Sequence, residues 1–168
     1  AREVADGYSA DGRPRWVAGS IGPGTKLPSL GHIPFAELRD AYAEQAAGLL
    51  EGGVDLFLIE TCYDLLQVKA AMVGCRRAMQ AAGRHVPLQV QVSMETTGRM
   101  LVGSEIGAAL VSVGAMQPDV IGINCSTGPP EMQFERRWAV LLVREVLKQL
   151  HREHDARGKG AGFIALQP

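Results

Sequence analysis

The sequence predicts an α/β fold in which helices cover a parallel β-sheet. Three observations support this prediction: short apolar runs, helical patterns between them, and a regular alternation of the two along the chain. The apolar runs follow one another at intervals of about 30 to 40 residues, the size of one βαβ unit. Right-handed crossovers between such units build a parallel sheet with helices packed against it.

Five apolar runs are the predicted strands. Each has four to seven residues, is rich in β-branched or aromatic residues, and is bounded by glycine, proline or polar residues. Short continuous apolar runs of this kind are typical of buried parallel strands. The predicted strands are 16–21, 54–59, 86–92, 120–123 and 163–166.

Apolar residues that recur every three or four positions predict helices between these strands. Pro34 suits the first turn of one helix. Asp64 can cap another, and Gln67 three residues later resembles a capping box. Gly83 ends that second helix. The predicted helices are 34–50, 64–82, 104–116 and 130–154.

Two architectures fit this order of elements: an open doubly wound sheet, or part of a (β/α)₈ barrel. A complete barrel typically needs about 250 residues, whereas this chain has 168. Both architectures bind ligands at the carboxyl ends of their strands. The residues that follow each apolar run are therefore the candidate functional residues.

Composition excludes several classes of partner. Lysine plus arginine number 17 and aspartate plus glutamate 18, so the net charge of −1 creates no field for nucleic acid or an anionic membrane. No segment reaches the roughly 20 apolar residues of a membrane helix, and residues 1–8 lack the apolar stretch of a signal peptide. Three cysteines are too few for a disulfide framework. We therefore expect a cytoplasmic protein.

Glu60 follows the run LFLI directly, at the predicted functional edge of the sheet. A partly desolvated carboxylate there can bind a substrate ammonium, act as a base or ligate a metal. The alternative interpretation is a carboxylate that only caps a helix or fixes a loop.

Cys125 follows another predicted strand, between Asn124 and Ser126. A thiol at that position suits nucleophilic or metal-ligand chemistry, although buried cysteine is more often a small hydrophobic residue. Cys62 also follows a strand, but two thiols without further partners make a poor zinc site. Cys75 falls within a helical pattern, where it is interpreted as packing.

Four segments carry a resemblance to a known family: GSIGPG (19–24), IETCYDLLQVKAA (59–71), GRMLVGSE (98–105) and IGINCSTGPPEM (121–132). In this order they resemble the homocysteine S-methyltransferases, and in particular the homocysteine-binding domains of cobalamin-dependent methionine synthases. The resemblance covers residues 16–132, and the combination of IETxxD with GxNCxxGP is fairly specific at this spacing.

The resemblance implies that residues 1–168 form one partial (β/α)₈ TIM barrel. The predicted strands would be the third to seventh of that barrel, with the first two and the last missing from this sequence. The family completes its zinc site with a Cys-Cys pair in a GGCCG motif at the eighth strand, and this sequence contains no such motif. The resemblance therefore implies an incomplete domain that is inactive by itself.

The resemblance also implies a mechanism. Cys125 matches the first zinc-ligating cysteine of the family, and Glu60 matches the glutamate that holds the amino group of homocysteine. Asn124 and Ser126 belong to the same motif and are expected to shape the substrate site. Zinc would hold homocysteine as a thiolate, which accepts the methyl group of methylcobalamin and gives methionine. The implied partners are folate- and cobalamin-binding modules of the same enzyme.

Two alternatives remain open on the sequence. The methyl donor could instead be betaine or S-methylmethionine, although IETCYDLLQVKAA is more similar to the cobalamin-dependent enzymes. The chain could also be a non-catalytic half-barrel that acts as an assembly module, which the missing Cys-Cys pair supports. The predicted helix 130–154 carries several basic residues and is interpreted as an exposed face, with a docking surface as the alternative.

Overall fold

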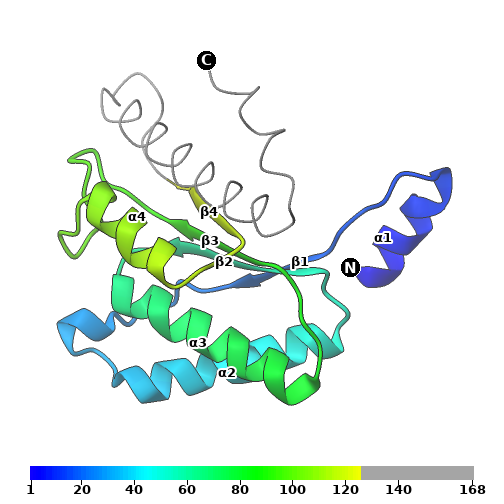
Figure 1. Ribbon diagram of the computed structural model, residues 1–168, viewed down its shortest axis with the longest axis horizontal. Helices are drawn as coiled ribbons and strands as arrows, with labels where there is room; N and C mark the ends of the chain where they lie inside the picture. Colours follow the sequence, from blue (N-terminus) through cyan, green and yellow to red (C-terminus); the bar gives the residue numbers. More distant parts are fainter. Residues whose placement is uncertain (126–168) are drawn as a thin grey trace, which may run out of the picture. The chain divides into compact units, whose positions relative to one another are not determined.

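A computed structural model describes residues 1–125 of the chain. These residues form a parallel sheet of four strands whose spatial order, β1-β2-β3-β4, is also their order in the sequence (Figure 1). The predicted parallel α/β fold is thereby confirmed. The predicted strand 163–166, the predicted helix 130–154 and Ser126 lie outside the described residues. The strands are β1 (Ala18–Ile21), β2 (Leu56–Cys62), β3 (Leu88–Val92) and β4 (Val120–Ile123).

The three helices predicted within residues 1–125 are present. Asp64 caps α3 as expected, with its side chain accepting a hydrogen bond from the backbone N–H of Leu66. Gln67 reaches the backbone N–H of Tyr63 rather than that of Asp64, so it satisfies a donor one residue outside a standard capping box. Gly83 ends the helix at a positive φ of 60°. The helices are α2 (Phe35–Glu51), α3 (Leu65–Ala82) and α4 (Ile106–Ala115).

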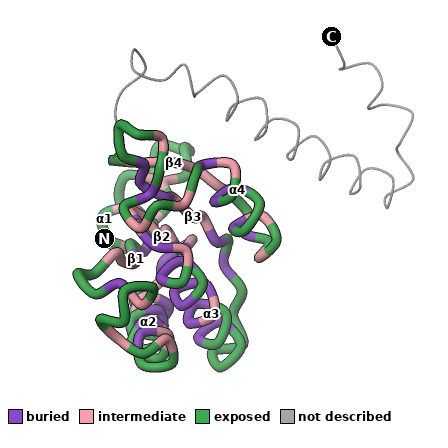
Figure 2. Tube along the Cα trace, turned by 90° about the vertical axis from the view of Figure 1, so that its left-hand side faces the viewer, coloured by how far each residue is buried: buried purple, intermediate pink, exposed green. Residues whose placement is uncertain are grey.

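Every connection between neighbouring strands passes through a helix on the same face of the sheet, as right-handed crossovers in sequential order require. Many residues of α3 and of strands β2 and β3 are buried (Figure 2). Within the described part of the chain the strand order never reverses, so it has no switch point of the kind that defines a doubly wound sheet. Of the two predicted architectures, this topology matches the barrel.

Helices α2 and α3 pack closely because Gly74 has no side chain. A Cβ atom at Gly74 would lie 2.7 Å from the carbonyl oxygen of Arg39 and 2.9 Å from the backbone nitrogen of Ala43. These two atoms belong to the backbone of α2, which cannot move aside cheaply. The glycine therefore sets the distance between the two helices.

The opposite face of the sheet mixes apolar and polar side chains. Ser20 on β1 pairs in register with Leu58 on β2, which pairs with Gln89 on β3. Ser20 is exposed, and Leu58 and Gln89 are half-buried. A barrel strand directs alternate residues into the barrel interior, so this is the face that a closed barrel would enclose.

Strand β2 is longer than predicted and contains a bulge. The sequence pattern ends the strand at Ile59, but ladder pairing resumes at Cys62, which lies opposite Val92. Ile59 pairs with Val90, so three steps along β2 match two along β3. Thr61 absorbs the extra residue with a φ of 58°. The bulge changes the direction of the side chains that follow it. Cys62 is buried in the core, whereas Glu60 and Thr61 contact Asn124 at the carboxyl end of the sheet.

The N-terminal segment forms a helix that the sequence patterns did not predict, α1 (Arg2–Tyr8), followed by a 3₁₀ turn at Ser9–Asp11. A second 3₁₀ turn lies at Pro28–Leu30. Arg2 pairs with Asp55 at 2.6 Å, and the same carboxylate accepts the backbone N–H of Val17 at 2.6 Å. The Val17 hydrogen bond and the Arg2 guanidinium lower the pKa of Asp55. Within residues 1–125, no helix combines the length and apolar character needed to cross a membrane.

Candidate functional site

Glu60 lies at the carboxyl end of β2 and is half-buried. Each of its carboxylate oxygens accepts one hydrogen bond from a neutral donor: Oε1 from the hydroxyl of Ser20 at 2.7 Å, and Oε2 from the side-chain amide of Asn124 at 3.3 Å. In the described part of the chain, no lysine or arginine forms an ion pair with Glu60. The side chain is thus oriented by neutral groups, and no cationic side chain in residues 1–125 competes with a cationic ligand for it.

Asn124 follows β4 and joins the ends of two strands that are not neighbours. Its Oδ1 accepts the backbone N–H of Thr61 at 2.9 Å, and its Nδ2 donates to the Thr61 hydroxyl at 2.7 Å. Its own backbone is fixed on β3, because the hydroxyl of Ser93 donates to the Asn124 carbonyl at 2.8 Å and the Asn124 N–H donates to Val92 at 3.3 Å. The ends of β2, β3 and β4 therefore converge on this side chain.

Cys125 is exposed beside this cluster, so the interpretation of it as a small buried hydrophobic residue does not hold. Its Sγ lies 3.8 Å from the Thr61 hydroxyl and 3.8 Å from Nδ2 of Asn124. Its φ of 49° is in the left-handed region, which non-glycine residues seldom adopt. The structure thus brings Glu60, Asn124 and Cys125 together at one edge of the sheet.

The other two cysteines are buried. Cys62 is 0% exposed and Cys75 is 0% exposed. Burial raises the pKa of Cys62 to about 12, with further contributions from the charges of Asp64 and Glu60, and burial likewise raises the pKa of Cys75 to about 12. A thiol with such a pKa stays protonated at neutral pH, so neither side chain is prepared for thiolate chemistry. The predicted packing role of Cys75 is confirmed.

The loop after β1 is held beside Glu60 by buried polar groups. Asp64, which is 0% exposed, accepts hydrogen bonds from the Ser29 backbone at 2.8 Å and the Ser29 hydroxyl at 2.6 Å. The carbonyl of Pro23 accepts hydrogen bonds from the hydroxyl of Tyr42 at 2.7 Å and from the amide of Gln67. Burial raises the pKa of the Tyr42 hydroxyl, which therefore remains a donor. These contacts fix one wall of the site.

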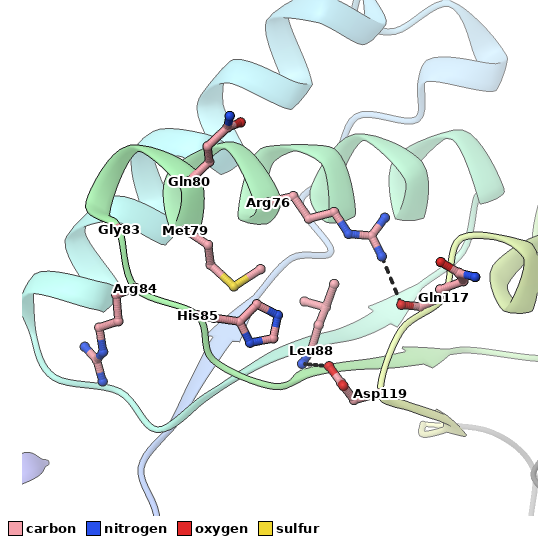
Figure 3. A pocket seen from close by; sticks show the side chains of 9 residues that line it. All are labelled: Arg76, Met79, Gln80, Gly83, Arg84, His85, Leu88, Gln117 and Asp119. Atoms are coloured by element: carbon pink, nitrogen blue, oxygen red, sulfur yellow. Dashed lines mark hydrogen bonds between the residues drawn. The ribbon is translucent and has the colours of Figure 1, made fainter. Parts of the chain in front are cut away.

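A separate cavity of about 510 Å³ lies at the other end of the strands. Figure 3 shows its lining residues, which include Met79, His85 and Leu88. The backbone of Leu88, the first residue of β3, donates to Asp119 at 2.7 Å, and Arg76 donates to the carbonyl of Gln117 at 3.0 Å. Parallel α/β sheets, open or closed, bind ligands at the carboxyl ends of their strands, so the candidate site remains at the carboxyl edge.

Thr61 and Ser20 also belong to this cluster, although the sequence pattern assigns them no role. Thr61 stands within the quoted segment IETCYD, but a β-branched residue after an apolar run predicts only more strand. Its contact with Asn124 depends on the bulge, which leaves no sequence signal. Ser20 lies within a predicted strand, and its orientation toward Glu60 follows only from the register between β1 and β2.

The chemistry of the side chains in this cluster suits a metal ion only in part. A thiol at an exposed edge, with neutral hydrogen-bond donors around its sulfur, suits zinc, which prefers sulfur and nitrogen ligands. Among residues 1–125, no group of three or more histidine, cysteine, aspartate or glutamate side chains is arranged to hold a metal. The chemistry of Cys125 fits that of one zinc ligand, and a zinc site here would need further ligands from outside residues 1–125.

Comparison with known proteins shows which protein family the chain belongs to. The family model for homocysteine S-methyltransferase matches residues 1–138, and the chain belongs to this family. Among solved structures, the homocysteine methyltransferase MmuM from Escherichia coli, in its apo form, matches with a TM-score of 0.58 at 22% identity, over 74% of this chain and 45% of that chain. This likeness supports the fold.

Two curated relatives are methionine synthases. The chain is 60% identical to the methionine synthase of Mycobacterium tuberculosis over 137 residues, which are 82% of this chain and 12% of that protein. It is 59% identical to the methionine synthase of Mycobacterium leprae, over 82% of this chain and 11% of that protein. The chain thus spans about one eighth of the length of these relatives. The resemblance to this family seen in the sequence is confirmed.

Proposed function

We propose that this chain is part of the homocysteine-binding barrel of a cytoplasmic methionine synthase. Its reaction is methyl transfer to the sulfur of homocysteine, giving methionine, with methylcobalamin as the donor. The identity of 60% to a methionine synthase supports this reaction, and the relatives' much greater length leaves room for folate- and cobalamin-binding modules.

The observation that carries the proposal is the joining of Glu60 to Cys125 through Asn124. Glu60 would bind the substrate ammonium, because its carboxylate is oriented by two neutral donors and forms no ion pair in residues 1–125. Cys125 would place the reacting sulfur through a shared metal ion. Asn124 would fix the spacing between these two groups, and we assign Ser126 to the same wall of the site.

The proposed metal is zinc, bound by Cys125 and by ligands from the rest of the barrel. When bound, zinc supplies the Lewis acidity that keeps a sulfur ligand in its thiolate form at neutral pH. Binding and orienting the substrate are tasks of the protein side chains. Glu60 orients the amino acid, and the loop after β1, held by Asp64 and Gln67, forms the wall beside it.

We also propose that residues 1–168 supply strands three to seven of a (β/α)₈ barrel. Support comes from the sequential strand order and from the matched homocysteine methyltransferase, of which this chain covers 45%. A completed barrel, meaning this segment joined to the two strands before it and the one after it, is therefore the protein in which function should be measured. The segment alone should bind homocysteine poorly.

The test uses Glu60→Gln in the completed barrel, with Glu95→Gln, an exposed glutamate at the same edge, as the matched control. A hydrogen bond to a charged group contributes about 1.5 to 3 kcal/mol, so the KM for homocysteine should rise roughly 10- to 100-fold in Glu60→Gln. The control should leave KM unchanged. An unchanged KM in Glu60→Gln would contradict the proposed role.

Methyl donors are compared in the same assay. Methylcobalamin, betaine and S-methylmethionine are supplied in parallel to the completed barrel, and methionine is measured. Of the three donors, we expect only methylcobalamin to give methionine. Product with betaine or S-methylmethionine would favour the other enzymes of the family, and no product with any donor would favour a non-catalytic assembly module.

A further inference from the structure

Thr61 has a backbone conformation that its side chain disfavours. Its φ is 58°, and for a β-branched residue this is a genuine outlier. Such conformations cost of order 1 to 3 kcal/mol and persist where the surrounding structure fixes them, often at functional sites. Only three non-glycine residues in the described part of the chain have a positive φ, and two of them, Thr61 and Cys125, contact each other.

The side-chain amide of Asn124 holds Thr61 in this conformation. A backbone N–H can only donate, so the Thr61 N–H requires the oxygen of the amide, at 2.9 Å. That requirement settles which end of the amide is which, and it turns Nδ2 toward the Thr61 hydroxyl at 2.7 Å. Two further acceptors lie within reach of Nδ2, a carboxylate oxygen of Glu60 at 3.3 Å and the sulfur of Cys125 at 3.8 Å, and both agree with the same orientation.

The hydroxyl proton of Thr61 is then directed at sulfur. A hydroxyl offers one proton and can accept at its lone pairs. Because Nδ2 of Asn124 already donates to the Thr61 oxygen, the hydroxyl proton is left for another acceptor. The Sγ of Cys125 lies 3.8 Å from that oxygen, within hydrogen-bond range for sulfur. A thiolate carries no proton, so with a thiolate at Cys125 the direction of donation is fixed.

We propose that Thr61 is a positioning residue that donates a hydrogen bond to the sulfur of Cys125 when that sulfur binds zinc. The proposal rests on the proposed function. Asn124 aligns the donor, the bulge in β2 presents it, and the hydrogen bond holds one lone pair of the sulfur so that another faces the metal. Outer hydrogen-bond partners of metal ligands typically change metal affinity by 10- to 100-fold.

Three substitutions at Thr61 in the completed barrel separate the hydroxyl from the shape of the side chain. Thr61→Val keeps the shape and loses the donor, whereas Thr61→Ser keeps the donor and loses the methyl group. Thr61→Ala loses both and decides the question if the valine variant fails to fold. Thr96→Val makes the same change as Thr61→Val at an exposed position and is the matched control.

The first measurement is zinc affinity by competition with a chelator. The valine and alanine variants should bind zinc roughly 10-fold more weakly, whereas the serine and control variants should match the parent protein. Parent-like affinity in the valine or alanine variant would overturn the proposal. A serine variant as weak as the valine variant would also overturn it, because the methyl group rather than the hydroxyl would then matter.

The second measurement is the sulfur-to-metal charge-transfer band of the cobalt-substituted protein. A hydrogen bond stabilises the lone pairs of the ligating sulfur, so its loss should move the band to longer wavelength in Thr61→Val and not in Thr61→Ser. An unmoved band in the valine variant would contradict the proposal. If the parent binds no metal, or binds it without Cys125, the proposed function itself is wrong; metal binding through Cys125 that ignores Thr61 defeats only this inference.

Discussion

The backbone N–H of Thr61 donates to the side-chain oxygen of Asn124 at 2.9 Å, across the end of a strand that lies between them. Thr61 belongs to β2 and Asn124 follows β4, and these strands are separated in the sheet by β3. One side chain spans this separation at the carboxyl edge of the sheet. Its Nδ2 lies 3.3 Å from a carboxylate oxygen of Glu60 and 3.8 Å from the sulfur of Cys125, so both groups lie at the same edge.

Replacing Asn124 with alanine should destabilise the completed barrel. The substitution removes the acceptor of the Thr61 N–H, and a partly buried donor without a partner costs about 1 to 3 kcal/mol. Urea unfolding would measure the loss, with Gln89→Ala, a half-buried residue of β3, as the comparison. A loss no larger than that of the comparison would show that the bridge does not hold the strands together.

Alanine substitutions at two helical glycines should have opposite effects on stability. Gly74→Ala places a Cβ 2.7 Å from the Arg39 carbonyl, so the helices must separate, at a cost of about 1 to 3 kcal/mol. Gly48→Ala, in α2, meets no atom within 4 Å and should stabilise by about 0.5 to 1 kcal/mol. Thermal unfolding of both variants checks the prediction, and a Gly74→Ala protein as stable as its parent would refute the close packing of α2 on α3.

Stability should decline at alkaline pH because Cys62 and Cys75 are buried. Their pKa values are raised from 9.0 to about 12, so above pH 9 the folded state binds more protons than the unfolded state. The free energy of unfolding then falls as pH rises, by about 1.4 kcal/mol per pH unit for each thiol, until the folded pKa is reached. Below pH 9 neither thiol affects the pH dependence.

The contribution of Cys62 is measured by comparing Cys62→Ala with its parent. Urea unfolding between pH 8 and pH 11 should show a shallower decline in the variant, whatever its absolute stability. Equal slopes in the two proteins would mean that Cys62 is more accessible than the structure indicates.

The order of strands and helices follows from the sequence because it depends on local patterns. The runs LFLI and VPLQVQV and the glycine at position 83 identify β2, β3 and the end of α3 without tertiary information. Register is different, because it depends on contacts between distant segments. The bulge at Thr61 inserts a residue with no local signal, so the sequence pattern ends the strand at Ile59 and does not predict the burial of Cys62.

The candidate site also contains residues that local sequence patterns indicate and residues that only the contacts between distant segments reveal. The sequence singles out Glu60 and Cys125 because chemically active residues at strand ends are informative in any parallel α/β fold, and the structure places both beside Asn124. It does not single out Thr61 and Ser20, because hydroxyl residues are common and their roles depend on where their neighbours lie. The helix Arg2–Tyr8 was missed for a similar reason: it is short and buries no residue, so it leaves no apolar period in the sequence.

The central claim is that Cys125 is the metal-binding thiol of this segment, and zinc content tests it most directly. The completed barrel is purified with zinc, dialysed, and assayed for bound metal beside Cys125→Ala and Cys62→Ala. The account predicts about one equivalent of zinc in the parent and in Cys62→Ala, and none in Cys125→Ala. Zinc retained by Cys125→Ala would contradict the account.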